Sequence, residues 1–192
     1  AQNEVFDFMK PLFLLAVVGG LLLLEPDFGA TVVISGTVMV MLFLAGVRLR
    51  YYAGLICLLA GILAVLAVSS PYRMARLTAF LNPWADQFNS GYQLTQSLIA
   101  FGRGGWFGIG LGSSVQKLLY LPEAHTDFLF AVLAEELGLL GVLLVLCLYS
   151  ILITRGFIIG FRAYQQTRFF AAHVAYGLTF WLGLQAAINM GV

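Results

Sequence analysis

Five long apolar runs alternate with polar segments along the chain. They cover roughly residues 8–24, 29–47, 51–69, 124–154 and 169–190. The hydrocarbon core of a bilayer requires about 20 apolar residues in a helix that crosses it. The short alternation of apolar and polar positions that is typical of membrane barrels is not seen. Because the backbone must satisfy its own hydrogen bonds in lipid, each run predicts a transmembrane helix.

A polar, glycine-rich segment over residues 70–123 separates the third run from the fourth. It contains Trp84, Tyr92 and Trp106, and disordered segments contain few such aromatic residues. Residues 92–101 could form a short helix at the membrane interface. Loops of this length are usually functional. We therefore expect one all-α, polytopic membrane domain, with three helices over 1–69, a large loop over 70–123 and two helices over 124–192.

Composition supports a membrane protein and excludes other classes. The chain is 61% hydrophobic and only 10% charged, and its mean hydropathy is +0.94. Soluble globular domains carry about 25% charged residues. The net charge of +1 excludes a nucleic-acid partner recognised by bulk charge. The chain begins at Ala1 and ends in an apolar run, so we expect a fragment of a longer protein.

Basic residues predict how the helices are oriented. Cytoplasmic connections are enriched in Lys and Arg. Six basic residues flank the apolar runs on one side: Lys10, Arg48, Arg50, Arg155, Arg162 and Arg168. That side, with a short connection between the last two helices, should be cytoplasmic. The loop over 70–123 should then be extracytoplasmic.

Acidic residues and a histidine gather where the loop meets the fourth apolar run. Glu123 and Asp127 are four residues apart, which places them on one face of a helix that begins at Pro122. A carboxylate in this position can accept a proton from a hydroxyl group. Alternatively, Thr126 and Asp127 only cap the helix. His125 could transfer protons, but a single histidine without a second ligand nearby makes a zinc site improbable.

Two further acids, Glu135 and Glu136, lie deeper in the same run. Acids at membrane depth are costly unless they face protein or water. A structural role, in which they pair with residues of other helices, and a functional role are equally consistent with the sequence.

The loop also carries four cations, which are Arg73, Arg76, Arg103 and Lys117. Cations at a membrane surface suit the recognition of phosphate or pyrophosphate, although general attraction to lipid headgroups is an alternative. Glycines over 102–105 and 108–112 look superficially like a nucleotide-binding loop, but the spacing and the required strand before it are missing. We expect these glycines to allow close backbone packing or a loop that moves.

Several motifs together resemble the SEDS family (shape, elongation, division and sporulation). They are Glu25-Pro-Asp-Phe-Gly-Ala-Thr31, Asn82-Pro-Trp84, Gly91-Tyr-Gln-Leu-Thr-Gln-Ser97, Ala100-Phe-Gly-Arg-Gly-Gly105, Ser114-Val-Gln-Lys117, Leu121-Pro-Glu-Ala-His-Thr-Asp-Phe128 and Ala134-Glu-Glu-Leu-Gly138. The Phe-Gly-Arg-Gly and Val-Gln-Lys stretches favour the cell-division branch over the rod-shape branch. The resemblance covers nearly the whole chain.

The resemblance implies a ten-helix glycosyltransferase of the bacterial cytoplasmic membrane, of which about helices five to nine are present here. Such an enzyme polymerises lipid II at the division site. Its partners are a class B penicillin-binding transpeptidase, other membrane proteins of the division machinery and membrane lipids. A lipid II flippase and a non-catalytic division scaffold remain alternatives.

The resemblance also implies roles for individual residues. The essential aspartate of the family falls on Asp127, which would be the general base of an inverting transfer. The candidate substrate-binding residues are Arg73, Arg76, Lys117, Glu123, His125 and Thr126. A divalent cation, Mg²⁺ or Mn²⁺, could assist the departing pyrophosphate.

Overall fold

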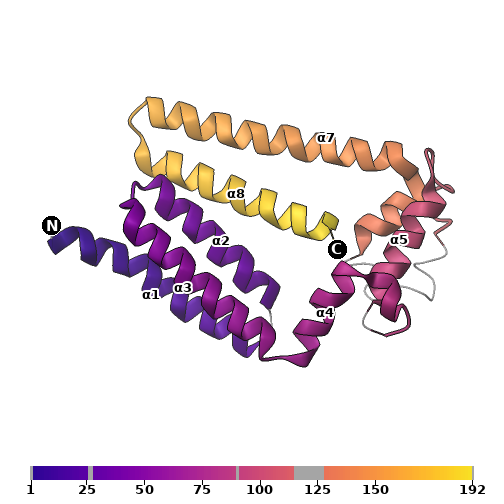
Figure 1. The fold of residues 1–192 in the computed structure, drawn as a ribbon. Helices are drawn as coiled ribbons and strands as arrows, with labels where there is room; N and C mark the ends of the chain where they lie inside the picture. Colours follow the sequence, from indigo (N-terminus) through magenta and orange to yellow (C-terminus); the bar gives the residue numbers. More distant parts are fainter. Residues whose placement is uncertain (1, 26–27, 90, 115–127, 192) are drawn as a thin grey trace. The chain divides into compact units, whose positions relative to one another are not determined.

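The computed structural model describes residues 2–25, 28–89, 91–114 and 128–191, and these ranges contain helices and no strand. Figure 1 shows the elements along the chain. They are α1 (Gln2–Leu24), α2 (Phe28–Leu44), α3 (Leu49–Val68), α4 (Pro71–Leu81), the 3₁₀ helix η1 (Pro83–Asp86), α5 (Tyr92–Gly104), α7 (Leu129–Gln165) and α8 (Phe169–Gly191). The all-α prediction is confirmed.

Two of these helices, α3 and α7, are long and apolar enough to cross a membrane. Met9–Leu24 and Phe28–Leu44 form shorter apolar helices. Large apolar side chains are exposed on these helices, such as Phe13 of α1 at 73% and Leu58 of α3 at 61%. Exposed apolar surface of this kind requires lipid or a protein partner. This surface and the two membrane-length helices fit the all-α membrane protein that the sequence predicts.

The expected end of the fourth run near residue 154 is wrong, because α7 continues to Gln165. Arg155 and Arg162 interrupt the apolar pattern, and the sequence therefore predicted a connection there. Both residues lie on α7 instead. Arginine is a good helix former, so a helix can extend beyond its apolar run. The helix ends before Thr167, whose φ is 58°.

The chain divides into two compact units, and the first comprises Ala1–Ala64 and Leu152–Gln185. Within it, α1 contacts α2, and the end of α7 lies antiparallel to α8 (Figure 1). Two glycines of α7 allow this approach, because a Cβ atom at Gly156 would meet the side chain of Thr179 and one at Gly160 would meet the ring of Tyr176. Small residues commonly allow such close packing between membrane helices.

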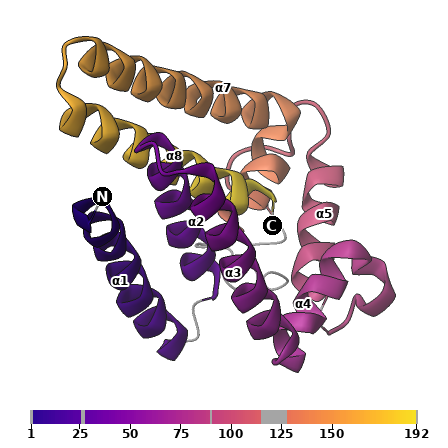
Figure 2. The same ribbon diagram turned by 60° about the vertical axis from the view of Figure 1, so that its left-hand side comes forward.

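The second unit comprises Val65–Ile151 and Ala186–Val192, and it holds the described part of the loop. Helices α4 and α5, which are labelled in Figure 2, both contact η1. The hydroxyl of Thr95 on α5 donates a 3.2 Å hydrogen bond to the carbonyl oxygen of Pro83. The predicted helix over 92–101 is confirmed by α5, and the described part of the loop is folded.

Candidate functional site

Helix α7 is broken at Gly138, where φ is 66° and ψ is −164°. In an unbroken helix the amides of Leu139 and Leu140 would donate to the carbonyls four residues earlier. Instead, Leu139 N–H donates to the carbonyl of Gly105 at 2.9 Å, and Leu140 N–H donates to that of Trp106 at 3.2 Å. The break therefore leaves these two amides with partners from the loop.

The carbonyl groups on the other side of the break are satisfied by the same part of the loop. The amide of Ile109 donates to the carbonyl of Glu135 at 3.0 Å, and the amide of Gly110 donates to that of Glu136 at 3.1 Å. Buried backbone groups require such partners. Residues 104–114, here called the glycine strap, thus replace the missing turn of α7.

Three glycines allow the strap and the helix to approach so closely. A Cβ atom at Gly104 would collide with the carbonyl of Ala134, and one at Gly108 would collide with the carbonyl of Glu136. A Cβ atom at Gly138 would collide with the backbone nitrogen of Gly108. The prediction of close backbone packing is confirmed for Gly104 and Gly108, whereas an added Cβ atom at Gly102, Gly105 or Gly112 would meet nothing within 4 Å.

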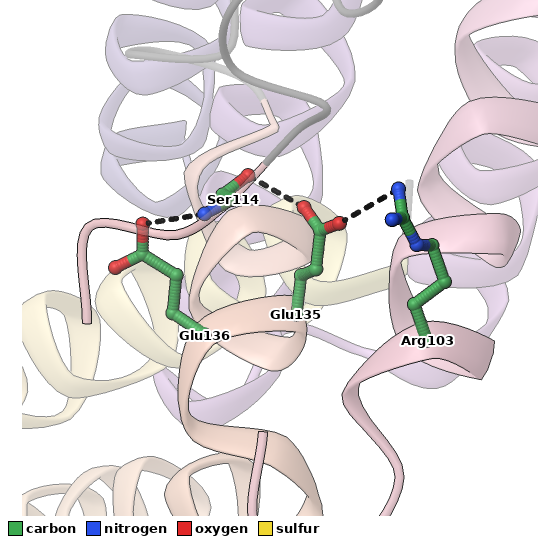
Figure 3. Close-up of polar contacts among 4 residues, drawn as sticks. All are labelled: Arg103, Ser114, Glu135 and Glu136. Atoms are coloured by element: carbon green, nitrogen blue, oxygen red, sulfur yellow. Dashed lines mark hydrogen bonds and ion pairs between the residues drawn. The ribbon is translucent and has the colours of Figure 1, made fainter. Parts of the chain in front are cut away.

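Ser114, at the end of the strap, is hydrogen-bonded to the side chains of Glu135 and Glu136 on α7 (Figure 3). The Ser114 hydroxyl donates a 2.5 Å hydrogen bond to Oε2 of Glu135, and the Ser114 amide donates a 3.4 Å hydrogen bond to Oε1 of Glu136. The other carboxylate oxygen of Glu135 lies 3.4 Å from Nη1 of Arg103 on α5. We call these four residues the Glu135 cluster.

The Glu135 cluster combines deep burial with one partly exposed cation. The side chains of Glu135 and Ser114 are fully buried, whereas that of Arg103 is 44% exposed. A buried carboxylate is costly unless it is paired and hydrogen-bonded. Arg103 supplies the charge, and Ser114 supplies a short charge-assisted hydrogen bond. Pairing of Glu135 with residues of other elements is the structural alternative that the sequence left open, and it is observed.

Asp127, the predicted catalytic base, lies outside the described residues. So do four of the predicted substrate-binding residues, which are Lys117, Glu123, His125 and Thr126. The described residues on either side of this stretch, Ser114 and Phe128, are both buried. Phe128 is 5% exposed and packs in a small core with Val132 of α7.

Arg73 and Arg76 both lie on α4, and the structure describes the side chain of Arg73 only. Nη1 of Arg73 donates a 2.8 Å hydrogen bond to the carbonyl of Leu66, near the end of α3. This contact stabilises the junction between α3 and α4. It uses one of the five N–H donors of a guanidinium group.

The sequence interpretation did not identify Ser114 or the pairing of Arg103 with Glu135. A serine after a glycine-rich stretch has many roles, and the distance of 21 residues between Ser114 and Glu135 gives no local signal. Among the residues that the structure describes, no group of three or more His, Cys, Asp or Glu side chains could hold a metal ion.

Comparison with known proteins identifies the family. The whole chain, residues 1–192, matches the FtsW/RodA/SpoVE family, described as "Cell cycle protein". It is 76% identical over 190 residues to the "Probable peptidoglycan glycosyltransferase FtsW" of Legionella pneumophila, covering 99% of this chain and 48% of the relative. The protein of the same name from Coxiella burnetii is 63% identical over 191 residues, covering 100% of this chain and 51% of the relative.

A solved structure is also similar. It comes from work titled "Structural coordination of polymerization and crosslinking by a peptidoglycan synthase complex". The TM-score is 0.65 at 30% sequence identity, over 98% of this chain and 52% of the other. The chain thus spans about half the length of the relatives that it matches. It belongs to the FtsW/RodA/SpoVE family of cell cycle proteins, the SEDS family that its motifs resemble.

Proposed function

We propose that this chain is part of a membrane glycosyltransferase that polymerises lipid II into peptidoglycan strands during cell division. The observation that carries the proposal is the likeness along the full chain to relatives named probable peptidoglycan glycosyltransferases, at identities of 76% and 63%. The protein would act in the bacterial cytoplasmic membrane at the division site, with the loop over 70–123 on the extracytoplasmic side.

The proposed reaction joins the sugar of one lipid-linked chain to the hydroxyl of another. Asp127 takes the proton of the acceptor hydroxyl, and the hydroxyl oxygen attacks the anomeric carbon of the donor. The bond from that carbon to the lipid pyrophosphate breaks as the new glycosidic bond forms. A single displacement with inversion is preferred over a covalent intermediate, because the hydroxyl of Ser114, which donates to the carboxylate of Glu135, is fully buried.

The remaining task is to stabilise the departing pyrophosphate, which carries the negative charge. Arg73, Arg76 and Lys117 are the proposed donors, since cations placed where charge develops lower the barrier. Glu123, His125 and Thr126 would contact the sugars. A bound Mg²⁺ or Mn²⁺ ion would add to the stabilisation of the pyrophosphate.

The proposed partners follow from the family and from the similar solved structure. That structure belongs to a peptidoglycan synthase complex, which supports an assembly with a second synthase component. We assign this role to a class B penicillin-binding transpeptidase. Other membrane proteins of the division machinery and membrane lipids are further proposed partners.

The feature of the sequence that supports a flippase is the pair of acids at membrane depth, Glu135 and Glu136, of which Glu135 is buried and Glu136 is half-buried. The contacts of Glu135 with Arg103 and Ser114 support a structural role for this acid and favour the glycosyltransferase over the flippase. The test uses the full-length protein, its partner transpeptidase and labelled lipid II. The proposal predicts glycan polymer from the wild type. Translocation of lipid II in vesicles without polymer would support a flippase, and neither activity would support a scaffold.

A further inference from the structure

We infer that α7 is a two-state element, in which the glycine strap and an intact helical turn compete for the same backbone groups. In the state described above, the strap bridges the break at Gly138. In the second state the strap is released, and α7 runs through Gly138 as a continuous helix. This inference goes beyond the proposed function and does not depend on it.

The backbone hydrogen bonds at the break form an exchangeable set. Four groups of α7 bond to the strap, and they are the amides of Leu139 and Leu140 and the carbonyls of Glu135 and Glu136. An α-helix joins each amide to the carbonyl four residues earlier. An unbroken α7 would therefore join Leu139 to Glu135 and Leu140 to Glu136. The four groups that the strap satisfies are thus the two pairs that a continuous helix satisfies by itself.

Release of the strap therefore leaves none of these four groups without a partner. Buried backbone groups that lose their partners oppose most rearrangements of this kind, and here that cost is avoided. The strap groups that bond to α7 belong to Gly105, Trp106, Ile109 and Gly110, and all four residues are exposed. Water can take the place of α7 at such groups, so both partners keep their hydrogen bonds in the second state.

The sequence at the break is compatible with both states. Gly138 has φ 66° and ψ −164° in the broken helix, a region that is almost restricted to glycine. Glycine is also tolerated within a helix, and its neighbours Leu137 and Leu139 are good helix formers. Local preference therefore favours the continuous helix, whereas the contacts with the strap favour the break.

The Glu135 cluster decides between these two tendencies. Ser114 donates to Glu135 through its hydroxyl and to Glu136 through its amide (Figure 3). A continuous helix cannot replace these contacts, because they join the strap to side chains rather than to the backbone of α7. They act as a latch on the broken state. A partner that binds the strap only after its release would shift the balance toward the continuous helix.

Hydrogen exchange at single amides distinguishes this exchange from simple loosening of the structure. The measurement uses the full-length protein in lipid nanodiscs and follows Ile109 and Gly110 on the strap and Leu139 and Leu140 on α7. Release of the strap with closure of the helix exposes the first pair only, because the second pair then bonds to carbonyls of its own helix. Local unfolding exposes all four amides.

Two substitutions should shift the balance toward the continuous helix. In Gly138→Ala, the added Cβ atom would collide with the backbone nitrogen of Gly108, and alanine disfavours the angles of the break. In Ser114→Ala, the latch loses the hydroxyl that donates to Glu135. Each variant therefore weakens the broken state through a different contact.

In both variants we expect Ile109 and Gly110 to exchange at least about tenfold faster than in the wild type. Leu139 and Leu140 should stay within about threefold of their wild-type rates. Equal acceleration at all four amides would overturn the inference, because the helix would then have no continuous state. Unchanged exchange of Ile109 and Gly110 in either folded variant would also overturn it, because the strap would then not be released.

Matched controls separate these effects from general destabilisation. Gly102→Ala adds a Cβ atom that meets nothing within 4 Å. Thr95→Val removes a buried hydroxyl that bonds to Pro83 rather than to α7. Both controls should exchange as the wild type does, and the same acceleration of the strap amides in them would count against the latch. Should Gly138→Ala fail to fold, Ser114→Ala decides, because it removes only one hydroxyl.

A distance measurement across the break tests the helix itself. Leu129 and Leu143 lie on either side of Gly138 and are 57% and 50% exposed, so both positions accept a spin label. In a continuous helix they would lie about 21 Å apart along the axis. After replacement of the native cysteines, pulsed electron paramagnetic resonance should show that the population at this separation grows in Ser114→Ala and Gly138→Ala. A distance distribution identical to that of the wild type in the folded variants would refute the continuous state.

Discussion

A Cβ atom on Gly104 would collide with the backbone carbonyl of Ala134, so α5 touches α7 at a point where no side chain fits. Gly104 is the last residue of α5, and the strap that completes the broken helix begins there. The contact is backbone against backbone and cannot be relieved by a change of rotamer. The close approach of the two backbones at this point therefore requires glycine at position 104.

Substitution of Gly104 by alanine should destabilise the protein by about 1–3 kcal/mol, the usual cost of overpacking a well-packed site. The matched control is Gly102→Ala, two residues earlier on the same helix, where an added Cβ atom meets nothing within 4 Å. Alanine should stabilise the helix there by up to about 1 kcal/mol. Thermal unfolding of the purified full-length protein checks both values, and equal melting temperatures for the two variants would contradict the predicted contact.

Substitution of Gly156 by alanine should weaken the packing of α7 against α8. The added Cβ atom would collide with the branched side chain of Thr179, which is buried and has little room to move. We expect a loss of about 1–3 kcal/mol in the free energy of unfolding. Gly61→Ala on α3 serves as the control, since its Cβ atom would meet open space. A Gly156→Ala variant as stable as the control would show that the two helices are not packed at this point.

Substitution of Arg73 by lysine tests its proposed contact with pyrophosphate. Lysine retains the charge but lacks the planar fork that binds phosphate oxygens in pairs, so KM for lipid II should rise by roughly tenfold. Any effect of the substitution on the hydrogen bond from Arg73 to Leu66 is measured separately by the melting temperature. The same change at Arg76 should raise KM in the same way. Wild-type KM in both variants would remove the two arginines from the site.

The apolar runs predicted the helices well because membrane helices need long apolar stretches, whatever their partners. They predicted the end of α7 poorly, because Arg155 ends an apolar run without ending a helix. The break at Gly138 also had no signal of its own. It depends on amide and carbonyl partners in the strap, which is distant in sequence.

The site was predictable only in part. The glycines of the strap indicated close backbone packing, and Glu135 and Glu136 indicated costly buried acids that need partners. Which partners they take could not be predicted, because Arg103 and Ser114 meet Glu135 only after α5, the strap and α7 have packed together. The role of Asp127 came from the motif around it, and it stays a prediction.

Polymerisation of labelled lipid II by a full-length Asp127→Asn variant tests the central claim most directly. Asparagine keeps the size of the side chain and removes the base, so the variant should fold, pair with the transpeptidase and make glycan at a rate reduced by at least about 100-fold. Glu123→Gln is the matched control and should retain far more activity, because Glu123 is assigned to binding. Glycan formation by Asp127→Asn at the wild-type rate would contradict the account.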